Sequence, residues 1–520
     1  MVIIYFLLNF TDTSFPLSYY YPTLRLGHDI FSGSKDYGPL SGFHKLSKKI
    51  GGGGIFKTYA FGMPIISVVR QIKLVIRLCV PHLPKQIYSH IFFYLQSGVD
   101  KVKSVLKNEF RGEGKGVGTF VMGEANAAAV LGDKGILYEN DPEKHGMLRR
   151  LVGSAMTPPS IGAAIPSIQE AARVQIDNIL QTSAAGLDTA IEMEKVFSDF
   201  TLDIAWKQIL GLDLDEEEVP TFHRAVEDWT AGVMDPLLLL PFRLPGLMRF
   251  TKVGRARTYL VSKVEEQLEK LDKDGPDDST LSKLYYATDE SEDGTTKRLT
   301  RTQVIDNALL LIFAGTETSA STLSCAALIL ALHPNVWQKI KDEQREIISK
   351  YGEDMTQQSI EECVYLDSVI KEVLRIKPLE LTELRKVDKA IIVDGKLIPK
   401  DWSVAINVKD THWNDAKVYK EDDSHMDLRH GFKPERWLDE STQPLSWMPF
   451  GSGGRRCIGE RLAYAEMKIF LSMLARKVDY ELVNEIKSDD DSAILWKANT
   501  AMARPLDGVL VKARAAALTD

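Results

Sequence analysis

The order of apolar and polar positions along the chain predicts a mainly helical fold with a small β portion. From about Gly98 to the end of the 260s, apolar residues recur at helical spacing, as in VDKVKSVLKNEF and AVEDWTAGVMDPLLLL. Shorter runs indicate strands, namely IFKTYAFGMPIISVV around a turn at residues 62–64 and AIIVDGKLIP further on. The acidic stretch with LDKDGPDDST and DESEDGTTKR is expected to form a solvated loop.

The longest apolar segment, VIDNALLLIFAGTETSASTLSCAALILALHPNVW, predicts one long helix. Its middle, GTETSAST, is polar and includes Glu317, and a charge in the centre of a bilayer is costly. We therefore expect a helix buried in a soluble core rather than a membrane span. Further helices are predicted in KDEQREII, at residues 362–376 and at about 459–476.

Composition narrows the classes of function. The chain has 520 residues, of which 44% are hydrophobic and 26% charged, so it can form a large globular core. Its net charge of -8, without a basic run interleaved with aromatics, argues against a nucleic-acid partner. The cysteines lie far apart without a CxxC pair, so neither a disulfide framework nor a Cys-rich zinc site is expected. They are Cys79, Cys325, Cys363 and Cys457.

Two segments near the start carry membrane signals. The opening MVIIYFLLNF is apolar, but about ten residues cannot cross a hydrocarbon core of roughly 30 Å. In VVRQIKLVIRLCV, the cations Arg70, Lys73 and Arg77 share one side of a helix, which is typical of a helix lying on a membrane surface. A buried or partner-packed helix fits the same pattern. Residues 1–39 are thus expected to be an atypical N-terminal segment that associates with a membrane.

The loop PFGSGGRRCIGE raises the main chemical question. It is not a phosphate-binding loop, because Glu460 stands where that motif needs a lysine, and Arg456 replaces the third glycine of a dinucleotide fingerprint. A cysteine phosphatase would need an arginine at Ala463. What remains is a thiol near a predicted helix N-terminus beside arginines, a setting that stabilises a thiolate. A redox sensor, a nucleophile, a metal ligand or a structural cysteine all stay open at this point.

The wider loop narrows these alternatives. Phe450, Gly453, Arg455, Cys457 and Gly459 form a Phe-x-x-Gly-x-Arg-x-Cys-x-Gly pattern, which resembles the haem-ligand loop of the cytochrome P450 family. The resemblance implies that Cys457 is the axial thiolate of haem b (iron protoporphyrin IX) and that Arg455 pairs with a haem propionate. It also implies that the glycines, Gly451 among them, let the backbone pass close to the porphyrin.

Ala314-Gly315-Thr316-Glu317-Thr318, in the middle of the long helix, resembles the oxygen-activation motif of the same family. Gly315 leaves room for haem and O2, and Thr318 can bond the carbonyl of Ala314. Glu317 and Thr318 would form an acid–alcohol pair that relays protons. The alternative is that Thr and Ser merely pack or bend the helix.

Two separated motifs resemble the family's structural core. Glu372 and Arg375 form a Glu-x-x-Arg pair with apolar flanks, and Arg436 lies in the later Pro-Glu-Arg-Trp motif. Such an i,i+3 pair is usually a weak surface ion pair. By resemblance, the three residues instead form a buried charged cluster that fixes the core near the cysteine loop.

Three more residues resemble contacts of the haem edge. Arg385 would bind a propionate, and His145 and Arg149 share one face of a predicted helix. The common family pattern has Trp where His145 stands, and branches that handle sterol- or retinoid-like lipids use His. A solvated helix face is the alternative for this pair.

The resemblance is interrupted twice. Residues 69–96 separate a predicted strand from the helix that should follow it directly, within a single domain at 40–515. We expect either an insertion that contacts a membrane or a normally untranslated segment retained in the coding sequence. A second, smaller insertion is expected around His425 and Asp427.

These observations imply a haem-dependent monooxygenase that inserts one atom of O2 into a lipophilic substrate. Electrons would come from a separate NADPH-dependent reductase or ferredoxin, docked on a basic face formed by Arg455, Arg456, Arg461 and Lys468. The residues from Glu380 to Glu383 are expected near the substrate. Membrane association is expected, with the endoplasmic reticulum as the main location and a plastid or the soluble cytoplasm as alternatives. Other readings are a haem-thiolate isomerase or dehydratase that needs no external electrons, and a non-catalytic haem sensor.

Overall fold

The computed structural model describes the chain from residue 130 to 516 apart from short gaps, together with residue 128 and pieces between 56 and 119. The gaps within the main part are 187–188, 233–249, 291–293, 295, 380–381, 388, 394, 401–402 and 485–503. Residues 1–39, residues 69–92, Glu380 and Leu381 lie outside the described residues, so the predictions made for them stay predictions.

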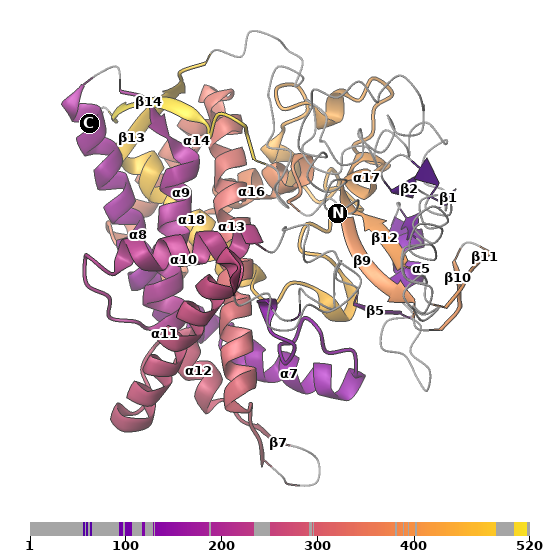
Figure 1. Ribbon diagram of the computed structural model, residues 1–520. Helices are drawn as coiled ribbons and strands as arrows, with labels where there is room; N and C mark the ends of the chain where they lie inside the picture. The colour runs from indigo at the N-terminus through magenta and orange to yellow at the C-terminus, as the bar shows by residue number, and fades with distance from the viewer. Residues whose placement is uncertain are drawn as a thin grey trace, which may run out of the picture.

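A long central helix organises the fold. This helix, α13 (Arg301–Ala331), begins with a capping box between Thr300 and Gln303. It is apolar on most sides and therefore needs partners on most sides. The helices α8 (Pro158–Ala185), α9 (Met193–Ile204), α10 (Val219–Gly232) and α11 (Lys252–Asp274) lie on one side of it, and the largest sheet lies on the other (Figure 1).

The remaining helices cover the ends of this bundle or connect it to the sheet. Four of them pack directly against α13, namely α12 (Thr280–Tyr286), α14 (Pro334–Tyr351), α16 (Val364–Ile376) and α18 (Glu460–Lys477). The others are α5 (Val99–Leu106), α7 (Pro142–Ser154), α15 (Gln357–Glu361) and α17 (Val408–Trp413). Shorter turns are η4 (Ala205–Leu210), η7 (Ser424–Met426), η8 (Pro434–Trp437) and η9 (Gly453–Arg455).

Aromatic packing joins α18 to the bundle. Phe470 contacts Phe197 and Phe200 edge to face, with ring centroids 5.1 and 4.8 Å apart, and all three rings are fully buried. Burying a phenylalanine side chain contributes about 1.5–3 kcal/mol. This contact therefore fixes the helix that follows the Cys457 loop.

The largest sheet has the strand order β1-β4-β12-β9-β5. Its strands are β1 (Phe56–Lys57), β4 (Phe93–Gln96), β12 (Ser403–Asn407), β9 (Thr382–Val387) and β5 (Val117–Thr119). Within it, β12 runs parallel to β4 and antiparallel to β9, so that Val404 lies opposite Arg385. A small apolar core beneath the sheet includes Val404, Ile406 and Val105 of α5.

Four small sheets complete the described structure. One has the order β13-β14-β6 and joins β13 (Val478–Leu482), β14 (Leu510–Ala515) and β6 (Ile191–Glu192). The others are the pairs β10 (Ile391–Val393) with β11 (Lys396–Ile398), β2 (Tyr59–Ala60) with β3 (Met63–Pro64), and β7 (Asp289–Glu290) with β8 (Thr296–Lys297).

Two sequence expectations need correction. Met63 and Pro64, placed in a turn, form strand β3. The acidic stretch is not only a loop, because α12 and the β7–β8 ribbon interrupt it. The last residues of the segment 69–96, Phe93–Gln96, form β4 between β1 and β12, and the expected insertion itself stays a prediction. Local polarity does not reveal these elements, because strand pairing with distant residues creates them.

Within the described residues, α13 is the one helix long and apolar enough to cross a membrane. Its most apolar window is 67% buried inside the molecule. This agrees with the expectation of a core helix.

Candidate active site

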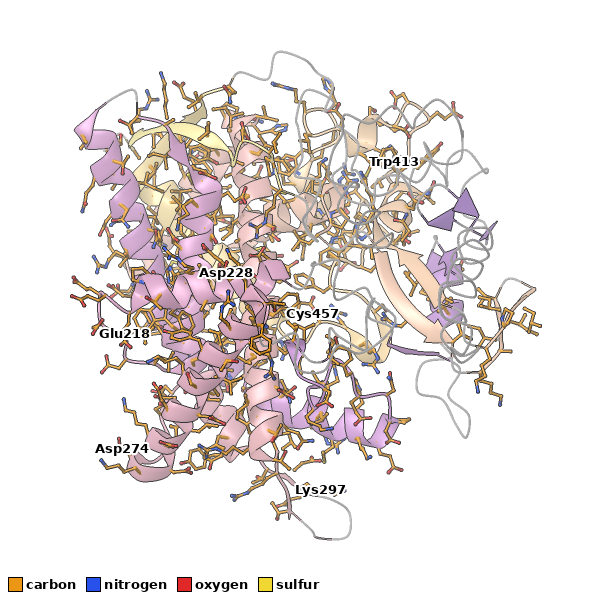
Figure 2. All side chains as sticks on the ribbon, in the orientation of Figure 1. Glu218, Asp228, Asp274, Lys297, Trp413 and Cys457 are labelled. Atoms are coloured by element: carbon orange, nitrogen blue, oxygen red, sulfur yellow. The ribbon has the colours of Figure 1, made fainter. Side chains whose placement is uncertain are left out.

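A closed glycine-rich loop carries Cys457. Gly451 and Gly453 both have a φ of 72°, in the left-handed region that residues with a side chain rarely adopt. The turn they form lets the Cys457 backbone N–H donate to the carbonyl of Phe450 at 2.9 Å. Cys457 is exposed and lies just before α18, which begins at Glu460. Figure 2 shows it near the centre of the molecule, between the bundle and the sheet.

The middle of α13 has an uncovered face. Most of this helix is buried, yet Ala314 is exposed and Gly315, Glu317 and Thr318 are only partly buried. Thr318 Oγ1 donates to the carbonyl of Ala314 at 2.6 Å, the bond that the sequence allowed. A methyl group added at Gly315 would meet only Ile209, at 3.7 Å. This stretch therefore offers space against the helix for a group that is not part of the chain.

A hydrogen bond between helices brings this face and the cysteine loop into the same region. Ser319 Oγ, on α13, donates to Glu466 Oε2, on α18, at 2.6 Å, and both residues are buried. Glu466 lies in the second turn of α18, about 9 Å of helix rise from Glu460. Burial raises the pKa of Glu466 to about 7.

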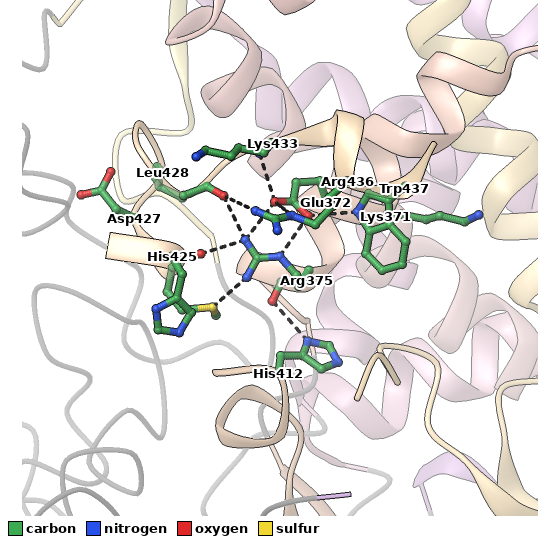
Figure 3. Close-up of polar contacts among 12 residues, drawn as sticks. Lys371, Glu372, Arg375, His412, His425, Asp427, Leu428, Lys433, Arg436 and Trp437 are labelled. Atoms are coloured by element: carbon green, nitrogen blue, oxygen red, sulfur yellow. Dashed lines mark hydrogen bonds and ion pairs between the residues drawn. The ribbon is translucent and has the colours of Figure 1, made fainter. Parts of the chain in front are cut away.

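Glu372, Arg375 and Arg436 meet in one cluster (Figure 3). Arg375 donates to Glu372 through two bonds of 2.9 Å, and Arg436 Nε donates to Glu372 Oε1 at 2.9 Å. The Trp437 indole N–H adds a further bond of 2.9 Å to Glu372 Oε2. Glu372 and Arg375 are completely buried, so this Glu-x-x-Arg pair is no surface ion pair.

The segment around His425, expected to be a small insertion, completes this cluster. Arg375 donates to the carbonyl oxygens of His425 at 2.8 Å and Gly431 at 3.1 Å. Its other terminal nitrogen lies 3.1 Å from the sulfur of Met426. The backbone of this segment therefore supplies acceptors that the buried guanidinium needs, and their sequence spacing from Arg375 gives no hint of it.

His412, which sequence reasoning missed, connects the cluster to the cysteine loop. The backbone N–H of Met448 donates to His412 Nε2 at 2.9 Å, so Nδ1 carries the ring proton and donates to the Arg375 carbonyl at 3.2 Å. Burial lowers the pKa of His412 to about 4, which keeps the ring neutral. The Met448 carbonyl in turn accepts a bond from Gly451 N–H at 3.1 Å.

Of the residues expected at the haem edge, His145 and Arg149 lie near Arg455, whereas Arg385 lies on the sheet. His145 is buried on α7, and burial, followed by the charges of Arg455 and Arg149, lowers its pKa to about 4. Arg455 donates to the Glu139 carbonyl at 2.6 Å and to Asn140 Oδ1 at 3.0 Å, which ties the start of α7 to the cysteine loop. Arg385 is buried on β9 of the sheet.

Glu317 has a partner that the sequence did not indicate. Its carboxylate pairs with the guanidinium of Arg504, from the C-terminal segment. Arg504 also donates to Glu194 of α9 at 3.0 Å. No motif or spacing in the sequence links these residues, because they come from three separate segments.

The expected basic docking face is smaller than predicted. Lys468 is buried and pairs with Asp367 at 2.8 Å, so it cannot meet a partner protein. Arg455 points to the segment before α7, and Arg456 pairs with Glu460 at 2.8 Å. Arg456 and Arg461 are the exposed cations that remain of the four.

These features together fit a haem. An exposed cysteine in a tight glycine turn can reach an iron, and the uncovered face of α13 leaves room for a planar ring. Cationic groups on α7, β9 and the cysteine loop can bind the carboxylates of such a ring. The fold and the site therefore define a mainly helical protein with room for a haem between α13 and the cysteine loop.

The chain belongs to the cytochrome P450 family, since the family model "Cytochrome P450" matches residues 97–503. It is 27% identical over 464 residues to cytochrome P450 26A1 of Xenopus laevis, covering 87% of this chain and 83% of the relative. It is 27% identical over 363 residues to abscisic acid 8'-hydroxylase 1 of Arabidopsis thaliana, covering 69% and 71%.

The fold also matches a solved structure, described as retinoic acid bound cyanobacterial CYP120A1. The TM-score is 0.69 at 23% identity, with 91% of this chain and 94% of that one covered. The protein is thus a haem-dependent cytochrome P450 monooxygenase, an oxidoreductase of mainly helical fold. Enzymes of this family act on lipophilic substrates with O2 and a redox partner.

Proposed function

We propose that Cys457 is the protein ligand of the haem iron and that the enzyme oxidises a lipophilic isoprenoid molecule. The observation that carries the ligand assignment is the exposed Cys457 in its closed loop, tied through α18 to the uncovered middle of α13. A thiolate-ligated haem supplies an electron-rich iron that favours cleavage of the O–O bond. The chain supplies the ligand, the pocket and the protons.

The cationic residues hold the cofactor in this proposal. Arg149, Arg385 and Arg455 bind the propionates, and the neutral His145 donates a hydrogen bond to one of them. Ala314 and Gly315 would lie against the ring, since both residues are small and the space beside Gly315 is open. Phe450 packs between Trp447 and Tyr464 and keeps the cysteine loop in place.

Glu317 and Thr318 relay protons in this proposal. Thr318 presents a hydroxyl on the uncovered face of α13, and Glu317 is the adjacent carboxyl group. Glu317 takes a proton from water and passes it to the Thr318 hydroxyl, which releases its own proton into the pocket. The helix carbonyl at Ala314 holds Thr318 between transfers.

The carbon monoxide difference spectrum of the reduced protein tests the ligand. The wild type is expected to show the thiolate signature, and Cys457→Ser is expected to lose it. Cys363→Ser is a matched control, because Cys363 is buried and bonded to the Ser359 carbonyl at 3.3 Å, a bond that serine can keep. A thiolate signature that survives in Cys457→Ser would refute the assignment.

The substrate class is inferred from the relatives. One is named for abscisic acid and one solved structure holds retinoic acid, and both molecules are isoprenoid acids. We expect retinoic or abscisic acid to shift the Soret band of this enzyme, while a saturated fatty acid of similar length does not. A stronger response to the fatty acid would contradict the isoprenoid class. Product formation without NADPH would indicate an isomerase instead.

Electron supply and location complete the proposal. A separate NADPH-dependent reductase or ferredoxin docks near Arg456 and Arg461, and the full chain associates with a membrane, at the endoplasmic reticulum. Reversing Arg461 to Glu is expected to slow reduction and weaken its dependence on salt. An unchanged rate and salt dependence would exclude this face. Recovery of the full-length protein in the soluble fraction alone would exclude membrane association.

A further inference from the structure

Arg504 lies between two carboxylates that come from different helices. Its Nη1 donates to Glu194 Oε1 at 3.0 Å, and its Nη2 pairs with Glu317 Oε2. Its Nε donates to Ser321 Oγ at 2.9 Å. One guanidinium thus connects α9, α13 and the C-terminal segment at the acid of the proposed proton relay.

The two carboxylates differ in their access to water. The side chain of Glu317 is 33% exposed, whereas that of Glu194 is 7% exposed and that of Arg504 is 10% exposed. Glu317 therefore occupies the open side of the guanidinium and Glu194 the closed side. A buried charge that loses its partner is strongly destabilising, so Arg504 needs a carboxylate at all times.

We propose that Glu194 is a positioning residue for the monooxygenase reaction, acting as the permanent counter-ion of Arg504 so that Glu317 can leave. This inference rests on the proposed relay through Glu317 and Thr318. When Glu317 takes up a proton from water it becomes neutral, and its attraction to Arg504 falls. It turns to the Thr318 hydroxyl, gives up that proton, and returns to Arg504 as a carboxylate.

Glu194 matters at the moment when Glu317 is away. Within the described part of the chain, Glu194 and Glu317 are the carboxylates in contact with Arg504. With Glu194 in place, the guanidinium stays neutralised while Glu317 moves. Without the charge of Glu194, the same movement would leave the guanidinium of Arg504 buried and unpaired. The ion pair between Arg504 and Glu317 would therefore not separate.

Glu194→Gln tests the inference in the haem-loaded enzyme with its redox partner and a substrate that shifts the Soret band. Haem content, the carbon monoxide signature and substrate affinity are expected to stay unchanged. Product formed per NADPH is expected to fall on the order of tenfold, less than the roughly hundredfold or larger loss expected for a group that itself transfers the proton, with more hydrogen peroxide released. The solvent deuterium isotope effect on turnover is expected to rise.

Three further variants make the result specific. Glu194→Asp keeps the negative charge and is expected to form as much product per NADPH as the wild type. The double variant Glu194→Gln with Arg504→Gln removes the guanidinium as well, so Glu317 is released and the isotope effect is expected to return toward the wild-type value. Glu192→Gln, an exposed residue on the neighbouring strand β6, is expected to change nothing.

The outcomes separate this inference from the proposed relay. If Glu194→Gln lowers the urea midpoint of unfolding but leaves the product ratio and the isotope effect unchanged, Glu194 is only structural and the inference is overturned. An equal loss in Glu194→Asp and Glu194→Gln would also overturn it, because charge would not be the cause. If Glu317→Gln itself leaves the product formed per NADPH unchanged, the proposed proton relay is refuted, whatever the result for Glu194→Gln.

Discussion

Ser319 on α13 donates a hydrogen bond of 2.6 Å to Glu466 on α18, and this bond lies inside the core. It joins the helix of the proposed proton relay to the helix that follows the Cys457 loop. Burial raises the pKa of Glu466 from 4.5 to about 7, and the hydrogen bond from Ser319 offsets only part of this shift.

The raised pKa predicts a pH-dependent stability. Below pH 4.5, Glu466 is protonated in the native and unfolded states alike; from there to pH 7 the native state keeps a proton that the unfolded state releases. Rising pH therefore destabilises the native state by about 3 kcal/mol across this window. Glu466→Gln stays neutral and keeps an acceptor for Ser319. Its unfolding free energy relative to wild type, from urea titrations, should rise from pH 4.5 to 7. A difference in unfolding free energy between variant and wild type that does not change with pH would contradict the raised pKa of Glu466.

The buried Glu-x-x-Arg pair should be far more sensitive to substitution than an exposed one. Arg375→Lys removes the two-bond contact with Glu372 and the bond to the His425 carbonyl, while the Gly431 carbonyl keeps its bond from Arg436. The charge beside Glu372 is kept, so the cost is that of buried acceptors left without a donor, and we expect a loss of about 1–3 kcal/mol in unfolding free energy, measured by urea titration.

Arg173→Lys is the matched control for that experiment. Glu170 and Arg173 have the same spacing on α8 and the same two-bond contact, but both side chains are 49% exposed. Solvent screens such a pair, so no measurable change is expected. Similar losses in the two variants would show that burial does not set the strength of the motif.

The backbone of the cysteine loop should require glycine. Gly453 has a φ of 72°, and an alanine there costs about 1–2 kcal/mol. Gly453→Ala is expected to lose that stability and also haem content, measured by absorbance after purification. Gly275→Ala provides the comparison, because Gly275 has a φ of 89° with open space around it, at the end of α11. Gly275→Ala should lose stability but keep its haem. A loss of haem in this variant would show that haem binding responds to general destabilisation and not to the cysteine loop.

Two threonines of α13 separate a proton relay from helix bending. Thr316 and Thr318 both donate to the carbonyl four residues back, at 2.9 and 2.6 Å. Only Thr318 lies on the uncovered face, since Thr316 is buried. Thr318→Ala is expected to lower product per NADPH at least about tenfold and release hydrogen peroxide, whereas Thr316→Ala keeps the wild-type ratio. Equal effects would favour the packing explanation.

The sequence by itself determined the helical framework, the family and the position of Cys457. Long apolar periodicity predicts α13, α14, α16 and α18 because a helix face is a local property of the chain. The glycines before Cys457 indicate a tight turn for the same reason, since positive φ is a property of the single residue.

Tertiary structure alone decided which charges are buried and with whom they pair. Glu170-x-x-Arg173 and Glu372-x-x-Arg375 are the same motif in sequence, and only packing makes one exposed and the other a core cluster. The contacts of Arg504 with Glu194 and Glu317 join segments more than a hundred residues apart. Pairing energies in a core depend on desolvation and on neighbours from distant segments, and neither can be read from local spacing.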